Sequence, residues 1–129
     1  MGSLVKLVLC FSMLFILSEA KTEVKIQNDI PRENITIHCY SVDDDVGTHL
    51  LTYGQSFSIR FWPNFFGGTK FYCGVKSLHG AGIYLVFDDF IASECYDFCL
   101  WFIRANGLCL RRNDNSLSCE RWTLYQPST

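Results

Sequence analysis

Apolar and polar residues alternate along most of the chain with a period of two. The alternation is clear at 24–26 ("VKI"), 35–41 ("ITIHCYS"), 57–62 ("FSIRFW") and 71–75 ("FYCGV"). Residues 83–87, "IYLVF", are apolar at every position, which is typical of a strand that is covered on both faces. No stretch keeps a 3.6-residue period. The pattern therefore predicts many short strands and no long helix.

The C-terminal third predicts a hairpin followed by a last strand. The runs at 100–104 ("LWFIR") and 108–112 ("LCLRR") flank Asn106-Gly107, a pair suited to the positive φ angles of a tight turn. Residues 119–125, "CERWTLY", form the last expected strand. Strands at this spacing predict an all-β domain, either an antiparallel sandwich or a barrel.

The first twenty residues carry a different pattern. A lysine precedes an unbroken apolar run at 7–17, "LVLCFSMLFIL", and "SEA" follows with small residues where a signal peptidase cuts. The run is too short to span a bilayer, which takes about 20 apolar residues. We therefore expect a secretory signal peptide at 1–20 and one extracellular domain at 21–129.

The cysteines predict disulfides. One of the seven lies in the signal peptide, and the six that remain are Cys39, Cys73, Cys95, Cys99, Cys109 and Cys119. An even number in a small secreted chain favours disulfide bridges. A zinc site at Cys95 and Cys99 is the alternative, but no second close pair of ligands completes it.

The spacing of the cysteines restricts their pairing. If 95–99 is extended, Cys95 and Cys99 lie about 13 Å apart, too far for a bridge that needs Cα atoms about 4.4 to 6.8 Å apart. Each would then reach an earlier strand, and we favour the following pairs over the swapped ones: Cys39–Cys99 and Cys73–Cys95. A third bridge, Cys109–Cys119, is expected to close a hairpin around a polar, turn-rich stretch.

Several motifs, in their order and spacing, resemble one known family. They are His38-Cys39 at a strand end, Asp43 to Gly47 followed by His49, Gly54, Asn64 to Gly67, Tyr72-Cys73, Cys95, Cys99, Trp101 and Asn106-Gly107. This arrangement is similar to that of the plant self-incompatibility proteins, the S-protein homologues, over almost all of 21–129. The common form has four cysteines, so Cys109 and Cys119 look like an added bridge.

The resemblance implies both a fold and a function. The fold is a small antiparallel β-sandwich of about eight strands, braced by disulfides. The function is that of a secreted, ligand-like protein that acts in cell–cell recognition or signalling through a cell-surface protein receptor.

The acidic run Asp43, Asp44 and Asp45 with His49 is the candidate recognition loop. Its aspartates are contiguous, and position twelve counted from Asp43 is a glycine, so it does not match a calcium-binding EF-hand loop. A looser metal site made of Asp43, Asp45 and His49 is the alternative. Because aspartates at a strand end hydrogen-bond their own backbone, we expect a surface loop without metal or cofactor.

Catalysis is not expected from this sequence. His38 and His79, with Lys76, are faintly similar to the acid, base and phosphate-binding groups of a secreted ribonuclease, but Gly-Leu-Trp does not follow His38. No Gly-x-Ser-x-Gly motif is present. The pair Asp88-Asp89 is expected at a strand end. A small ribonuclease is therefore only a remote alternative.

Charge and one modification motif complete the picture. The formal net charge is -2, which argues against nucleic-acid binding and against a cationic defence or toxin-like protein, the other alternative. The one locally basic stretch, 110–112 ("LRR"), is expected to be a solvated turn. Asn34 begins the glycosylation motif "NIT". No insertion into a membrane is expected.

Overall fold

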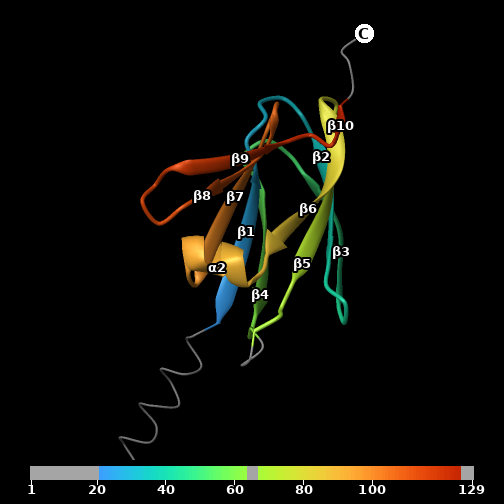
Figure 1. The fold of residues 1–129 in the computed structure, drawn as a ribbon. Coiled ribbons are helices and arrows are strands. Elements are labelled where there is room, and N and C mark those ends of the chain that lie inside the picture. Colours follow the sequence, from blue (N-terminus) through green and yellow to red (C-terminus); the bar gives the residue numbers. More distant parts are fainter. Residues whose placement is uncertain (1–20, 64–66, 126–129) are drawn as a thin grey trace, which may run out of the picture.

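The computed structural model describes residues 21–63 and 67–125, so the expected signal peptide lies outside the described residues. Two five-stranded sheets form a sandwich (Figure 1). Sheet A has the strand order β4-β1-β7-β8-β9, and sheet B has the order β10-β6-β5-β2-β3. This confirms the predicted all-β sandwich, with two more strands than the eight expected.

Most strand bounds follow the predicted segments, but the strand at Asp45–Leu51 was missed, because Asp45, Gly47 and His49 were expected in a surface loop. Sheet A contains β1 (Thr22–Asn28), β4 (Ser56–Phe61), β7 (Phe98–Arg104), β8 (Gly107–Arg111) and β9 (Leu117–Arg121). Sheet B contains β2 (Ile35–Tyr40), β3 (Asp45–Leu51), β5 (Phe71–Lys76), β6 (Gly80–Phe87) and β10 (Leu124–Tyr125). The pairs are antiparallel except for β1 with β7, which are parallel. That pair departs from the purely antiparallel sandwich that was expected.

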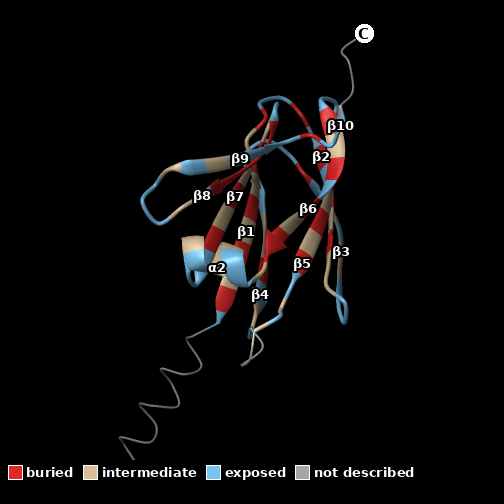
Figure 2. Ribbon diagram, in the orientation of Figure 1, coloured by how far each residue is buried: buried red, intermediate tan, exposed pale blue. Residues whose placement is uncertain are grey.

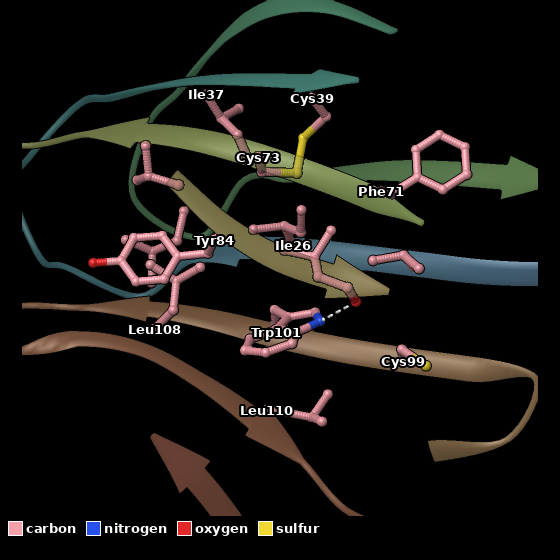
Figure 3. Packing of buried hydrophobic residues seen from close by; sticks show 14 of the residues in the cluster. Ile26, Ile37, Cys39, Phe71, Cys73, Tyr84, Cys99, Trp101, Leu108 and Leu110 are labelled. Carbon is pink, nitrogen blue, oxygen red and sulfur yellow. Dashed lines mark hydrogen bonds between the residues drawn. A yellow bond between two sulfur atoms is a disulfide. The ribbon is translucent and has the colours of Figure 1, made fainter. Parts of the chain in front are cut away.

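The core lies between the two sheets and consists mainly of every second residue of their strands. Buried residues alternate with more exposed ones along the strands (Figure 2). Ile26 and Trp101 enter from sheet A and Ile37 from sheet B (Figure 3). The Trp101 indole N–H donates to the backbone oxygen of Val86 at 3.0 Å, so a buried hydrogen bond joins the two sheets.

The expected last strand is divided between the two sheets. Residues 119–121 belong to β9 of sheet A, whereas Leu124 pairs with Ala81 of β6 in sheet B. The crossing is fixed at Trp122, which is buried and donates from Nε1 to the Ala105 oxygen at 2.7 Å. The prediction of one continuous strand was wrong, because the Trp122 side chain is anchored in the core where the chain passes from sheet A to sheet B.

The tight turn between β7 and β8 is shifted by one residue. Arg104 pairs with Gly107, so Ala105 and Asn106 form the two-residue loop and Gly107 is the first residue of β8. Gly107 has a φ of 144°, and a side chain there would collide with the backbone of Glu120. The glycine is therefore required by the close approach of β9.

The described residues contain one helix, α2 (Asp89–Cys95). Asp88 caps it, since its Oδ1 accepts the backbone N–H of Ile91 at 2.7 Å. The pair Asp88-Asp89 does follow strand β6, but it begins a helix. Seven residues are too few to display a helical period, which is why the sequence pattern missed it.

The disulfides differ from the favoured pairing in two of three cases. Cys109 is joined to Cys119, as the sequence predicts. The predicted bridges Cys39–Cys99 and Cys73–Cys95 are wrong, because the structure contains the following pairs: Cys39–Cys73 and Cys95–Cys99. The error came from assuming that 95–99 is extended.

The true geometry of 95–99 brings its cysteines together. Cys95 ends helix α2, and the chain reverses at Tyr96, which has a φ of 55°. The Cα atoms of Cys95 and Cys99 are therefore 5.1 Å apart, within the normal range for a disulfide. The zinc alternative fails for the same reason, because both sulfur atoms are bonded to each other.

Candidate recognition surface

The turn between β2 and β3 carries two of the candidate residues, Asp43 and Asp44, and the third, Asp45, begins β3. The Ser41 N–H donates to the Asp44 oxygen at 2.7 Å, and the Asp44 N–H donates to Ser41 Oγ at 3.0 Å. These bonds fix the backbone of the turn. Val42 is 94% exposed, and Asp43 and Asp44 are also exposed. The carboxylates of these two aspartates make no hydrogen bond or ion pair within the described residues.

Asp45 differs from its two neighbours because its carboxylate has structural partners. Its Oδ1 accepts the Gly47 N–H at 2.9 Å and lies 2.7 Å from His38 Nε2. The Gly47 N–H and the His38 imidazole hold the pKa of Asp45 below its ordinary value. The expected bond from an aspartate to its own backbone is present, and Gly47 has a φ of 92°. The expected loop is shorter than predicted, because Asp45–Leu51 form strand β3.

His49 does not join the aspartates. It pairs with Ile37 in the β2–β3 register and therefore points to the core side of sheet B. Its ring stacks on Phe57 of β4 with 4.0 Å between ring centroids, and its Nε2 lies 3.2 Å from the Val46 oxygen. The structure thus places His49 between the edges of the two sheets and leaves His38 as the imidazole of the acidic loop.

No metal centre is formed within 21–63 and 67–125, where no group of three or more His, Cys, Asp or Glu side chains converges. The two histidines of the ribonuclease alternative are also kept apart. His38 is bound to Asp45, whereas His79 Nδ1 lies 2.8 Å from Glu33 Oε2. His38 and Lys76 line one open groove, and His79 does not.

The outer face of sheet B is largely apolar and open to solvent. We define the "sheet B face" by outward residues of its five strands: Thr36, His38, Tyr40, Leu50, Tyr72, Lys76, Ile83 and Leu124. A shallow groove of about 540 Å³ runs across it above Gly74, where no side chain fills the surface. Ile83 is 64% exposed and Leu124 is 68% exposed on this face.

The sheet B face contradicts the prediction that residues 83–87 are covered on both sides. Residues 83–87 were expected to be covered on both sides because all five are apolar. Tyr84 and Val86 do point into the core, but Ile83 points outward. An apolar run therefore signalled an exposed apolar surface, which is uncommon on a protein that binds nothing. The sequence alone does not show that this side of β6 is open, because that depends on the strand order of sheet B.

Glu33 and Asn28 form a buried polar cluster that the sequence did not reveal. Asn28 is fully buried, and its Nδ2 donates to the backbone oxygens of Glu33 at 2.7 Å and Leu51 at 3.0 Å. The Glu33 carboxylate accepts the Leu78 N–H and contacts His79. The cluster fixes the loop before β2, and the next residue, Asn34, is exposed.

No helix among the described residues is long and apolar enough to cross a membrane. One family model matches residues 23–122, and its description is "Plant self-incompatibility protein S1". The match spans nearly all the residues that build the two sheets.

Similar proteins come from Arabidopsis thaliana. S-protein homolog 29 is 40% identical over 101 residues, which cover 74% of this chain and 72% of the homologue. S-protein homolog 2 is 35% identical over 103 residues, covering 75% and 63% respectively. S-protein homolog 5 is 30% identical over 101 residues, covering 78% and 77%.

Proposed function

Because the chain belongs to the plant self-incompatibility protein S1 family, we propose that it is a secreted, ligand-like protein that binds a cell-surface protein receptor in cell–cell recognition. The signal peptide expected at 1–20 takes it out of the cell, and the 21–129 domain is the active form. A glycan at Asn34 belongs to the same proposal.

One observation carries the receptor proposal. The β2–β3 turn presents an exposed aliphatic side chain, Val42, on a backbone that is already ordered. Beside it lie two carboxylates that have no partner among the described residues. Cys39, at the end of β2, is bonded to Cys73 in the adjacent strand, so the base of the turn is covalently fixed. A loop that is rigid before binding loses little entropy when a partner docks, which favours a recognition role.

The apolar sheet B face extends this surface. Tyr40 and Tyr72 lie side by side near the turn, with 5.9 Å between their ring centroids. Both tyrosines are half-buried, and tyrosine is enriched in the centres of protein interfaces. A receptor that fits both parts would place basic groups at Asp43 and Asp44 and apolar groups along the groove.

The test is saturable binding of the refolded 21–129 protein to plant membranes, with covalent cross-linking to identify the receptor. Asp43→Asn with Asp44→Asn should weaken binding about tenfold, because two interfacial ion pairs are lost. The matched control is Asp97→Asn with Glu120→Gln, which removes two exposed charges elsewhere and should change binding little. Absence of saturable binding, or an equal loss in both variants, would rule out this receptor surface.

A further inference from the structure

Each of the five strands of sheet A contributes one Lys or Arg side chain to the outer face of the sheet. The five residues are Lys25 of β1, Arg60 of β4, Arg104 of β7, Arg111 of β8 and Arg121 of β9. Each follows or precedes a core residue, as Lys25 lies between Val24 and Ile26. The alternation therefore turns all five side chains away from the core.

The strand register aligns these cations in rows. Lys25 pairs with Leu100, which pairs with Arg111, and Arg104 pairs with Gly107, which pairs with Arg121. Cations two strands apart in a row are about 10 Å apart, because neighbouring strands are spaced by roughly 4.8 Å. The face thus offers regularly spaced positive charge across its width.

This charge opposes that of the whole chain. The five strands of sheet A contain five cations and two carboxylates, Glu23 and Glu120, although the chain as a whole has a formal net charge of -2. Arg60 pairs with Glu23 and Arg104 with Asp29. Lys25, Arg111 and Arg121 make no ion pair within the described part of the chain.

Apolar side chains lie between the cations. Phe98 is 41% exposed, and Leu100 and Phe102 are half-buried on the same outward side. Arg104 lies over the Phe102 ring, with its Cζ 5.4 Å from the ring centroid. The face of Phe102 is therefore occupied, which leaves too few open rings for the base stacking that single-stranded nucleic acid uses.

We infer that the outer face of sheet A binds an acidic polysaccharide. Its repeated carboxylates pair with Lys25, Arg111 and Arg121, and the C–H faces of its sugar rings pack on Phe98 and Leu100. This site lies on the sheet opposite to the proposed receptor surface, so neither proposal depends on the other. Binding of this kind would retain a secreted protein close to the matrix around cells and limit its diffusion.

The experiment measures binding of the refolded 21–129 protein to immobilised polygalacturonate over a range of salt concentrations. The triple variant Lys25→Gln, Arg111→Gln and Arg121→Gln should lose about tenfold or more in affinity, since three ion pairs are removed. The matched control removes the same charge from exposed cations on other faces: Arg32→Gln, Lys70→Gln and Lys76→Gln. The control should bind almost as well as the unmodified protein.

Further probes distinguish the polysaccharide from other polyanions. Fully methyl-esterified polygalacturonate, which lacks the negative charge, should not bind, and affinity should fall as salt rises. Equal losses in the two triple variants would reveal non-specific attraction and overturn the site. Equal or tighter binding of single-stranded DNA of matched charge would overturn the assignment to a polysaccharide. Phe98→Ala should weaken polygalacturonate binding, and no effect would contradict the sugar contact.

Discussion

Cys39 of β2 and Cys73 of β5 lie directly opposite each other in sheet B, with 4.1 Å between their Cα atoms, and a disulfide joins them. Both residues are fully buried. The bridge therefore links adjacent strands of one sheet and does not tie the two sheets together. Contact between the sheets depends on apolar packing and on hydrogen bonds such as that from Trp101 to Val86.

The disulfides should stabilise the fold in the order of the loops that they close. Replacing Cys39 and Cys73 by alanine should lower the free energy of unfolding by about 4 kcal/mol, and replacing Cys109 and Cys119 by about 3 kcal/mol. The reason is that the first pair is 34 residues apart and the second 10 residues apart. Urea unfolding measures both, and non-reducing peptide mapping checks the pairing. A larger loss in the Cys109–Cys119 variant would contradict the prediction.

The buried amide of Asn28 should be intolerant of charge. Asn28→Asp replaces the Nδ2 donor by an oxygen that faces the Glu33 and Leu51 backbone oxygens. The free energy of unfolding should fall by roughly 3 to 5 kcal/mol, because a buried charge loses water and gains no donor there. Gln27→Glu changes the preceding residue, whose side chain points outward, and should change the free energy of unfolding by less than about 0.5 kcal/mol. Similar losses in both variants would show that burial of Asn28 is not the cause.

Asp45 should stabilise the acidic loop only while it is ionised. Its folded-state pKa lies below the ordinary value of about 3.9, so its contribution is fully present above pH 4 and is lost as the pH falls through the folded pKa. Asp45→Ala should therefore lower the melting temperature at neutral pH and match the unmodified protein in strong acid. Asp43→Ala removes a carboxylate that has no partner among residues 21–63 and 67–125, so it should have little effect at either pH. A difference for Asp45→Ala that persists in strong acid would oppose this interpretation.

The acidic loop should not need a metal ion. A bound ion stabilises the folded state by mass action, so a chelator would lower the melting temperature if one were held at Asp43 to Asp45. We expect no change on adding a chelator and no saturable calcium isotherm. A fall of several degrees that calcium reverses, and that Asp43→Asn with Asp45→Asn abolishes, would restore the metal-site alternative.

The sequence by itself determined most of the strands, because the alternation of side chains along a strand is a local property that ten or fewer residues display. It missed β3, where the polar residues Asp45, Gly47 and His49 favoured a loop. It also predicted the Cys109–Cys119 bridge, since both cysteines flank one polar turn and fall opposite each other in a hairpin. The bond from Asp45 to the backbone of Gly47 was also predicted, because it spans only two residues. The contact of Asp45 with His38 was not predicted, since the sequence grouped the aspartates with His49.

The tertiary structure decided everything that depends on which distant segments become neighbours. The pairing of Cys95 with Cys99 required a short helix too brief for its period to be visible, and the place of Ile83 on an open face required the strand order of sheet B. The row of cations on the outer face of sheet A could not be predicted from the sequence, because its charges are spread from Lys25 to Arg121 in an acidic chain. Only the register of five strands aligns them, because the attraction that selects a partner strand comes from core residues on the opposite side of each strand.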